Sequence, residues 1–323
     1  MTDAKNQFAL VADIGGTNTR VALADGPKVI QSTIRRYANT DYTGLEPVLR
    51  QYLVDQGNVD AIAACVAVAG PVQNGKATMT NLDWAMDEAT IADVTKAETV
   101  AILNDLQAQG YAVGHIAESN LNSILVGEAT HESAAKLVVG VGTGFNAAPV
   151  FETPGGRIVP ASESGHPTLP TRTPQDVELS NFVGKTHNFP SIEDVLSGRG
   201  IENIYAFVTS QSGTEERLKA NEIMAACSQG DAKATETVAI CVRMLGSVCG
   251  NLALTILPFG GIFLVGGVSR ALAPYLASVD FEEAFCDKGR FQEFMKSFPI
   301  SVVTDDYAAL TGCAAYLSQI KLD

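Results

Sequence analysis

Three glycine-rich turns, each placed directly after a short apolar run, are the residues of this chain best suited to chemistry. They lie in FALVADIGGTNTRVAL from Phe8, KLVVGVGTGFNAAPV from Lys136 and GIFLVGGVSRAL from Gly261. Glycine lets backbone N–H groups approach a phosphate closely, and Thr17, Asn18 and Thr143 add hydroxyl and amide groups at the same places. One such turn can be a tight turn without a ligand. Three turns, each after an expected parallel strand, predict a nucleotide phosphate site built from several loops. The glycine spacing fits neither a Walker P-loop nor a dinucleotide Rossmann motif.

Two carboxylates follow expected strands. Asp13 ends the first strand, where a buried carboxylate needs a partner such as a cation; otherwise it is a polar strand end. Asp105 and its neighbour Asn104 follow the strand ETVAILN. Open α/β sheets place functional groups at the carboxyl ends of their strands, and a carboxylate there can accept a proton from a hydroxyl nucleophile. The alternative is that Asn104 and Asp105 only cap the next helix, a place that both residue types favour.

Composition limits the function classes. At 323 residues the chain is long for one core, so we expect two domains. The net charge of −14 and pI near 4.7 argue against a nucleic-acid partner, because that affinity depends on Lys and Arg. The six cysteines form no C-x-x-C or zinc-binding pattern and lie in apolar runs, so we expect reduced core residues.

No membrane or secretion segment is expected. The N-terminal residues MTDAKNQ are polar and lack an apolar signal region. The most apolar long segment, 231–257, has an uncharged part of about 14 residues, shorter than the ~20 that a membrane span needs. We therefore predict a long buried helix there and a cytoplasmic protein.

The apolar pattern predicts alternating strands and helices, and hence an α/β structure with both faces of each sheet covered. The first three strands have short connections and should be antiparallel neighbours. The expected strands and helices are as follows: strands 8–13, 19–24 and 29–37, a helix at 43–56, apolar strands in 61–72 and 98–105, strands in 121–127, 136–142, 146–152 and 156–161, a mainly helical stretch 173–257, a strand 261–267, a short helix from about Ser269, and a final strand and helix after 299.

Over nearly its whole length the chain resembles the bacterial glucokinases of the actin-like, hexokinase-type ATPase superfamily. The motifs that carry the resemblance are DIGGTNTR, LND, GTG at Gly142–Gly144, E-x-G-H at Glu163–His166, S-x-E-x-V-L-S-G at Ser191–Gly198, FGGIFLVGGV and FEEAFCDKGRF. The resemblance implies a two-domain α/β, actin-like ATPase (ribonuclease H-like) fold with an interdomain cleft. We expect a small domain at 1–115 plus 304–323 and a large domain at 116–303.

The resemblance also implies roles for residues. Asn104 and Asp105 would bind the sugar, with Asp105 as general base, and Glu163, His166 and Glu193 would complete the sugar site. Taken alone, a single histidine is more often structural, and Glu193 would be an exposed first-turn acid of a helix. The residues expected to bind ATP are Gly15, Gly16, Thr17, Asn18, Gly142, Thr143, Gly144, Gly266 and Gly267. Asp13 would also belong to this group, holding Mg²⁺ through water.

The implied function is ATP-dependent phosphorylation of D-glucose at the 6-hydroxyl by a homodimer. Alternatives are a kinase for fructose, mannose or an amino sugar, and a non-catalytic sugar-binding regulator. Two departures from the family pattern bear on this choice. Phe145-Asn146 follows GTG where Leu-Gly is usual, so Phe145 could narrow the loop beside the ligands. Ser164 replaces a glycine, which would cost about 1–2 kcal/mol if φ is positive there.

Overall fold

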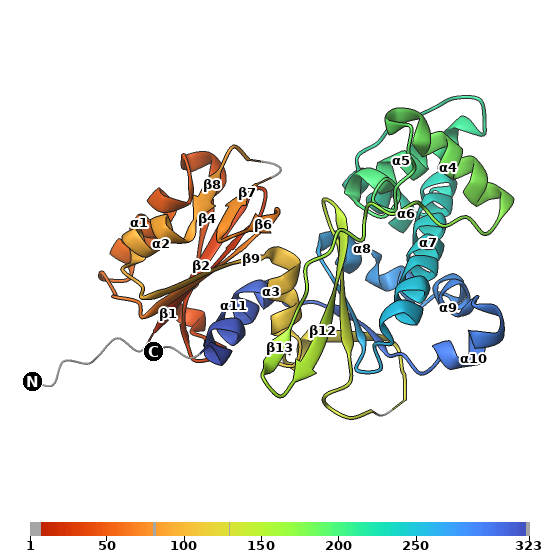
Figure 1. Cartoon of the computed structure of the whole chain (residues 1–323). Coiled ribbons are helices and arrows are strands. Elements are labelled where there is room, and N and C mark those ends of the chain that lie inside the picture. The colour runs from red at the N-terminus through yellow and green to blue at the C-terminus, as the bar shows by residue number, and fades with distance from the viewer. Residues whose placement is uncertain (1–7, 80–81, 129, 321–323) are drawn as a thin grey trace, which may run out of the picture. The chain divides into compact units, whose positions relative to one another are not determined.

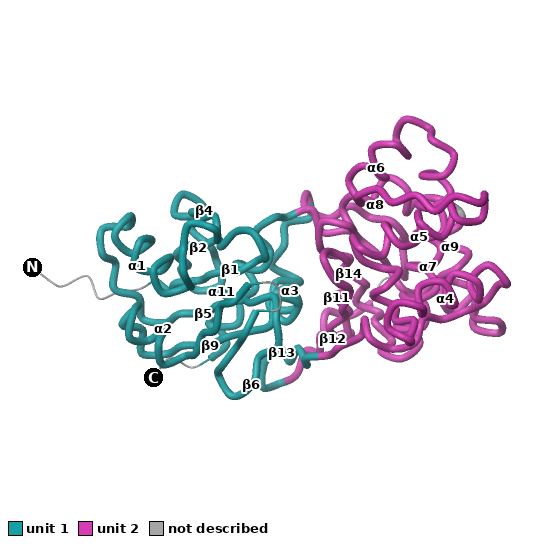
Figure 2. The backbone as a smooth tube through the Cα atoms, turned by 90° about the horizontal axis from the view of Figure 1, so that it is seen from above, with its two compact units in different colours: residues 1–118, 154–161, 305–323 teal, residues 119–153, 162–304 magenta. Residues whose placement is uncertain are grey.

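The computed structural model describes residues 8–79, 82–128 and 130–320 (Figure 1). Residues 1–7, on which the expectation of no secretion signal rests, lie outside the described residues. The chain divides into two compact units, coloured separately in Figure 2. Unit 1 comprises Met1–Glu118, Pro154–Ala161 and Asp305–Asp323, and unit 2 comprises Ser119–Thr153 and Ser162–Thr304.

Unit 1 is an α/β layer structure with a small additional three-stranded antiparallel sheet. Its elements are β1 (Ala9–Ile14), β2 (Asn18–Asp25), β3 (Lys28–Val29), η1 (Gln31–Thr33), β4 (Arg35–Ala38), η2 (Asn39–Asp41), α1 (Leu45–Asp55), β5 (Ala63–Val68), β6 (Val72–Gln73), β7 (Lys76–Thr78), β8 (Ala85–Asp87), α2 (Glu88–Thr95), β9 (Thr99–Asn104), α3 (Asp105–Ala112), β13 (Gly156–Ile158) and α11 (Ala308–Gln319). The short η3 (Glu118–Asn120) lies at the boundary of the two units.

The main sheet of unit 1 has the strand order β3-β2-β1-β5-β9, with β4 also paired to β2. β1, β5 and β9 are parallel, whereas β2 is antiparallel to β1, β3 and β4. The predicted antiparallel start and the apolar parallel strands are therefore confirmed. The single strand predicted over 29–37 is wrong: η1 interrupts it, because the Thr33 hydroxyl bonds the carbonyl of Ile30 and the N–H of Leu23.

Helices bury the central strands of unit 1 on both faces. All six residues of β5 are buried, as expected for a continuous apolar strand in such a sheet. α1 contributes Leu45, Val48, Leu49 and Tyr52 to this core, which confirms the predicted amphipathic helix. α11 packs against α3 so closely that a Cβ on Gly312 would lie 1.7 Å from the carbonyl oxygen of Ala108.

Unit 2 combines a sheet with a helical layer built around one long helix. Its elements are β10 (Leu121–Leu125), β11 (Lys136–Val141), β12 (Phe145–Thr153), α4 (Pro174–His187), α5 (Gly198–Ser210), α6 (Ala220–Ser228), α7 (Ala232–Ile256), β14 (Ile262–Val265), α8 (Gly267–Leu276), α9 (Val279–Cys286), η4 (Gly289–Phe291), α10 (Gln292–Met295) and β15 (Ile300–Val303).

In this sheet β14 lies between β15 and β11 and is parallel to both. β12 is antiparallel to β11, and β10 is antiparallel to β15. The glycine turns after β11 and β14 therefore follow parallel neighbours, as predicted. The helix expected from about Ser269 begins two residues earlier, at Gly267.

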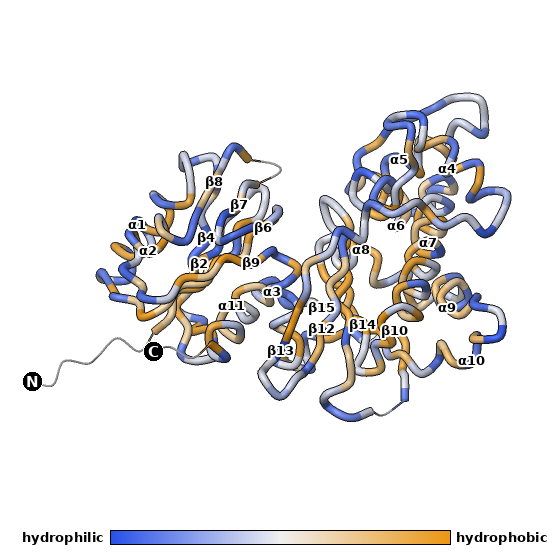
Figure 3. The backbone as a smooth tube through the Cα atoms, in the orientation of Figure 1, coloured by the Kyte–Doolittle hydropathy of each residue, from blue (hydrophilic) through white to orange (hydrophobic). Residues whose placement is uncertain are grey.

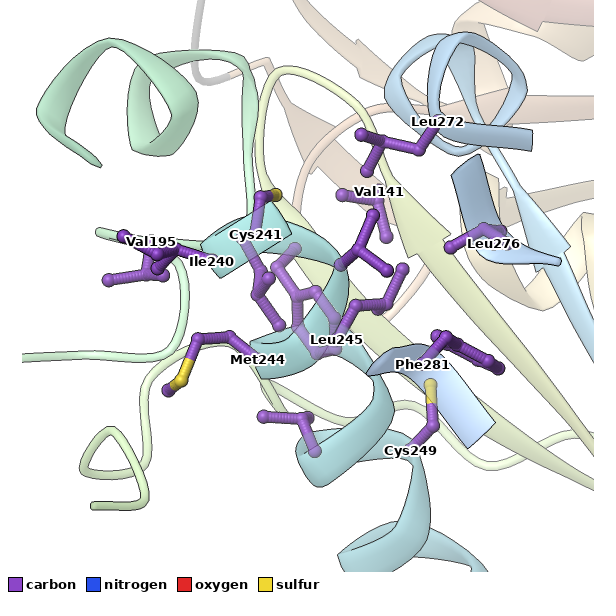
Figure 4. Packing of buried hydrophobic residues seen from close by; sticks show 14 of the residues in the cluster. Val141, Val195, Ile240, Cys241, Met244, Leu245, Cys249, Leu272, Leu276 and Phe281 are labelled. Carbon is purple, nitrogen blue, oxygen red and sulfur yellow. The ribbon is translucent and has the colours of Figure 1, made fainter. Parts of the chain in front are cut away.

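α7 is the long buried helix predicted from the sequence. Figure 3 shows hydrophobic residues along it and along the strands of the sheet, and Figure 4 shows Leu245 and Cys249 of α7 near Leu276 of α8 and Phe281 of α9. By length and composition α7 is the one described helix that could cross a membrane, but 56% of its most apolar window is buried inside the protein. It therefore serves as a core helix.

All six cysteines are buried and free, which confirms the expectation of reduced core residues. Burial raises the pKa of the Cys241 and Cys249 thiols to about 12, since a thiolate there would lose its hydration. These groups are structural.

Candidate active site

The expected functional groups of unit 1 gather at one edge of its sheet. The register pairs Ile14 of β1 with Val68 of β5, and Val68 with Asn104 of β9. Asp13 and Asp105 therefore stand at the carboxyl ends of parallel strands, with only β5 between β1 and β9. This is where open α/β sheets place their ligands.

Asp13 has a protein partner. Arg20 Nη1 lies 3.1 Å from Oδ2 of Asp13, and the two residues face each other in the β1–β2 register. Burial nevertheless raises the pKa of Asp13, and Arg20 opposes that shift. The Arg20 guanidinium therefore supplies the partner that a buried carboxylate needs, so burial by itself does not indicate a metal ion at Asp13.

The turn Gly15–Asn18 is pinned by a residue that the sequence reasoning missed. The amide of buried Asn39 donates to the carbonyl of Gly15 at 2.8 Å, and the Asn39 backbone N–H donates to the carbonyl of Thr17 at 2.9 Å. Asn39 Oδ1 also accepts from the Thr19 hydroxyl at 2.8 Å. The turn that should meet phosphates is thus held rigidly on both sides of Gly16.

Asn104 is the N-cap of α3, with its Oδ1 accepting from the N–H of Leu106 at 3.1 Å. Its Nδ2 donates to the carbonyl of Gly70 at 3.1 Å, so the carboxamide is oriented by both contacts. The capping alternative therefore describes one role of Asn104.

Asp105 is the first residue of α3, and its Oδ1 accepts from the N–H of Leu106 at 2.9 Å. Burial, and secondarily the charge of Asp13, raises the pKa of Asp105 to about 6. A carboxylate with a pKa close to neutral is a stronger proton acceptor than an ordinary aspartate and is still ionised at physiological pH. The hydrogen bond from Leu106 and the raised pKa of Asp105 thus suit a general base.

The glycine turns of unit 2 also share one edge. Gly140 of β11 pairs with Val265 of β14, so Gly142–Gly144 and Gly266–Gly267 follow the carboxyl ends of adjacent parallel strands. Gly266 has a φ of 98°, and a Cβ there would lie 2.4 Å from the Val141 carbonyl oxygen. α8 begins at Gly267 with no side-chain cap, which leaves N–H groups of its first turn for an anion.

Glu193 links the Gly142–Gly144 loop to two other segments. Its Oε2 accepts from the backbone N–H of Phe145 at 3.0 Å, and Arg199 Nη2 lies 3.3 Å from its Oε1. A Cβ on Gly144 would lie 2.4 Å from Oε2 of Glu193, so any other residue there would require the Glu193 carboxylate to move.

Glu163 and His166 lie in one exposed turn next to Glu193. Their side chains are 69% and 62% exposed, with 3.8 Å between Glu163 Oε2 and His166 Nε2. The turn joins Glu193 through Gly165, whose carbonyl accepts from the Glu193 N–H at 2.9 Å. The structure therefore brings Glu163, His166, Glu193 and the Gly142–Gly144 loop together within unit 2.

The two departures from the family pattern have different outcomes from those expected. The Phe145 side chain is buried in the core of unit 2, so the prediction that it narrows the loop beside the ligands is wrong. The reason is the alternation of β12, which turns Phe145 inward and Asn146 toward the other face. Ser164 is not among the described residues with positive φ, so replacing the glycine causes no backbone strain of that kind.

Asn39, Arg20 and Arg199 contact the candidate site residues and were missed by the sequence reasoning. Arg20 could have been found, because a four-residue turn Gly15–Asn18 between antiparallel strands pairs Ile14 with Thr19 and therefore Asp13 with Arg20. The others lie in segments whose pairing no local pattern predicts. Among the described residues, no group of three or more His, Cys, Asp or Glu side chains could hold a metal ion.

Comparisons with known proteins agree over nearly the whole chain. The sequence model of a family described as Glucokinase matches residues 10–320. The glucokinase of Neisseria meningitidis serogroup C is 32% identical over 310 residues, which are 95% of this chain and 94% of that protein. The glucokinase of Rhizobium johnstonii is 30% identical over 95% of this chain and 90% of its own length. The crystal structure of glucokinase from an Antarctic psychrotroph superposes with a TM-score of 0.86 at 31% identity, covering 97% of this chain and 99% of that one.

Proposed function

Because the chain belongs to the glucokinase family, we propose that it transfers the γ-phosphoryl group of ATP to the 6-hydroxyl of D-glucose. The products are glucose 6-phosphate and ADP. The expected two-domain, actin-like ATPase fold is confirmed by the likeness to the psychrotroph glucokinase. The observation that carries the catalytic assignment is Asp105, a carboxylate at the carboxyl end of β9 with a pKa of about 6.

Asp105 acts as the general base in this proposal. Its carboxylate accepts the proton of the 6-hydroxyl while that oxygen forms a bond to the γ-phosphorus of ATP. The bond between the γ-phosphorus and the bridging β–γ oxygen breaks, and ADP leaves. The N–H of Leu106 and the N-terminus of α3 hold the carboxylate in place.

In this proposal glucose is bound by carboxamide, carboxylate and imidazole side chains. Asn104 contributes an oriented carboxamide, and Glu163, His166 and Glu193 contribute carboxylates and an imidazole. Each sugar hydroxyl is both donor and acceptor, so carboxylates and an imidazole can pair with several hydroxyls at once. Glu193 also accepts from Phe145 N–H, which ties the sugar contacts to the Gly142–Gly144 loop.

The glycine turns bind the nucleotide. A Cβ built on Gly16, Gly142 or Gly267 would meet nothing within 4 Å, so each turn leaves open space beside its backbone. Phosphates can occupy this space and accept from the exposed N–H groups. We assign Gly15, Gly16, Thr17, Asn18, Gly142, Thr143 and Gly144 to the phosphates, and Gly266 and Gly267 to the adenosine.

Asp13 fits a magnesium site. Arg20 engages Oδ2, and Oδ1 takes no hydrogen bond from the described residues, so one hard oxygen is free for an ion or its water. Mg²⁺ commonly uses one or two carboxylates and keeps several waters. When bound, the ion would neutralise charge on the phosphates. Arg20 holds the Asp13 carboxylate in place and opposes the rise in its pKa that burial causes.

We further propose a cytoplasmic homodimer, joined through the larger domain. We place this interface on the helical layer of unit 2. Light scattering after gel filtration distinguishes a dimer from the monomer of 34.0 kDa.

The direct test is a coupled assay of the purified protein with Mg-ATP and a panel of hexoses. We expect glucose-dependent ADP and sugar phosphate in equal amounts, with far lower turnover of fructose, mannose and glucosamine. Faster turnover of another hexose would show that this sugar, and not glucose, is the preferred substrate. Glucose that raises the melting temperature without turnover would instead identify a sugar-binding regulator.

A further inference from the structure

Asn146 is the second residue of β12, and its carboxamide reaches the turn that carries Glu163 and His166. Its Nδ2 donates to the carbonyl of Ser162 at 2.6 Å, and its Oδ1 accepts from the N–H of Ser164 at 2.9 Å. These partners lie directly before and directly after Glu163. One planar group therefore brackets Glu163 on both sides.

The serines extend this network. The hydroxyl of Ser162 lies 3.1 Å from Asn146 Oδ1 and 2.8 Å from the hydroxyl of Ser164, and it also bonds the Ala147 carbonyl. Ser162 and Ser164 are half-buried, whereas Glu163 between them is exposed. The network thus lies beneath the turn and leaves the Glu163 side chain free for a ligand.

Packing alone cannot hold the two ligand-facing side chains. Glu163 and His166 are mostly exposed, so their positions depend on the backbone of the turn. Asn146, by contrast, is fixed by a paired strand, since it stands opposite Gly140 of the buried β11. A carboxamide supplies a donor and an acceptor from one rigid group, which neither a carboxylate nor an aliphatic side chain can do.

We propose that Asn146 is a positioning residue for glucose: it transmits the rigidity of β12 to the Glu163–His166 turn and so presents Glu163 and His166 to the sugar. This inference rests on the proposed assignment of Glu163 and His166 to glucose binding. Asn146 itself touches only the protein.

The test measures glucose and nucleotide affinity separately, by calorimetry, for wild type, Asn146→Ala, Glu163→Ala and the double variant. Losing the bracket should weaken glucose binding about tenfold or more in Asn146→Ala, with nucleotide affinity within about twofold of wild type. If Asn146 acts through the turn, its replacement should matter much less once Glu163 is already Ala.

Thr209→Ala is the matched control. The buried Thr209 hydroxyl bonds the carbonyls of Tyr205 and Ala206 and accepts from the Glu216 N–H, so it pins another loop of unit 2 to a helix. We expect this variant to lose stability comparably and to keep wild-type glucose affinity. Asn146→Asp is a second variant that keeps the shape and the acceptor but loses the bond to the Ser162 carbonyl. It should also weaken glucose binding.

Unchanged glucose affinity in Asn146→Ala and Asn146→Asp would overturn the inference. So would independent, multiplying effects of Asn146→Ala and Glu163→Ala, or an equal loss of nucleotide affinity, because these describe a general structural role. A wild-type protein that neither binds nor phosphorylates glucose would overturn the proposed function itself, and this inference with it.

Discussion

Replacing Asp105 by Asn should stabilise the protein at neutral pH while removing its kinase activity. Burial raises the pKa of Asp105 from 3.8 to about 6, so the folded protein holds this proton more tightly than the unfolded chain does. Folding stability therefore falls as pH rises from about 4 to about 6, and the loss persists at higher pH. An uncharged isostere does not suffer this loss.

The magnitude follows from the shift. About two pH units at ~1.4 kcal/mol each amount to about 3 kcal/mol above pH 7, and to about half of that at pH 5. Asn keeps an oxygen to accept from the Leu106 N–H but loses the attraction of a negative charge to the N-terminus of α3, about 0.3–1 kcal/mol. We therefore expect a gain of about 2 kcal/mol in the free energy of unfolding at pH 8.

Urea unfolding of ligand-free protein at pH 5 and pH 8 measures this gain, and the coupled assay should show at least a hundredfold loss of turnover. Asp87→Asn is the control in unit 1, because the N–H of Thr90 lowers the pKa of Asp87 and the same replacement there should reduce stability. An Asp105→Asn variant no more stable than wild type at pH 8 would refute the claim that this carboxylate is held at a cost. Full activity in that variant would refute its role as base.

Three further variants test contacts described above. Asn39→Ala removes the bonds that pin Gly15, and we expect a several-fold higher KM for ATP and a loss of about 1–3 kcal/mol in urea unfolding. Gly144→Ala places a Cβ 2.4 Å from Glu193 Oε2, so Glu193 must move and the KM for glucose should rise about tenfold. An unchanged KM would show that Glu193 does not bind the sugar. Gly312→Ala forces α11 away from α3 and should lower stability by about 2 kcal/mol or more, seen as a lower melting temperature; an unchanged value would contradict such close packing.

The sequence predicted the layers well where apolar runs were long. β5 and α7 are continuous apolar segments, and both lie buried where the pattern placed them. The prediction failed over 29–37, where the β-branched residues Val29, Ile30, Thr33 and Ile34 favour a strand. There the Thr33 hydroxyl bonds the backbone of Ile30 and Leu23 and favours a 3₁₀ turn. Hydrophobic periodicity cannot predict such a turn, because it does not record which side chains form hydrogen bonds with the backbone.

The site was predictable only in part for a similar reason. The residues proposed to touch ligands stand in short motifs that can be read locally, such as the glycine turns. The residues that hold those motifs in place are distant in the sequence: Asn39 lies 24 positions from Gly15, and Asn146 lies 18 positions from Ser164. Such contacts depend on how distant segments meet, which periodicity and capping rules do not describe.

The discontinuous course of unit 1 has a consequence for synthesis on the ribosome. Its first 118 residues precede unit 2 in the chain, but α11, which packs on α3, is made only after unit 2. The proposed base is the first residue of α3, so α11 can cover its helix only after unit 2 has been synthesised. Unit 2 is complete at Thr304 and can fold while unit 1 still lacks its last helix. We expect unit 2 to resist proteolysis in a nascent chain stopped before residue 305, and unit 1 to remain open to cleavage.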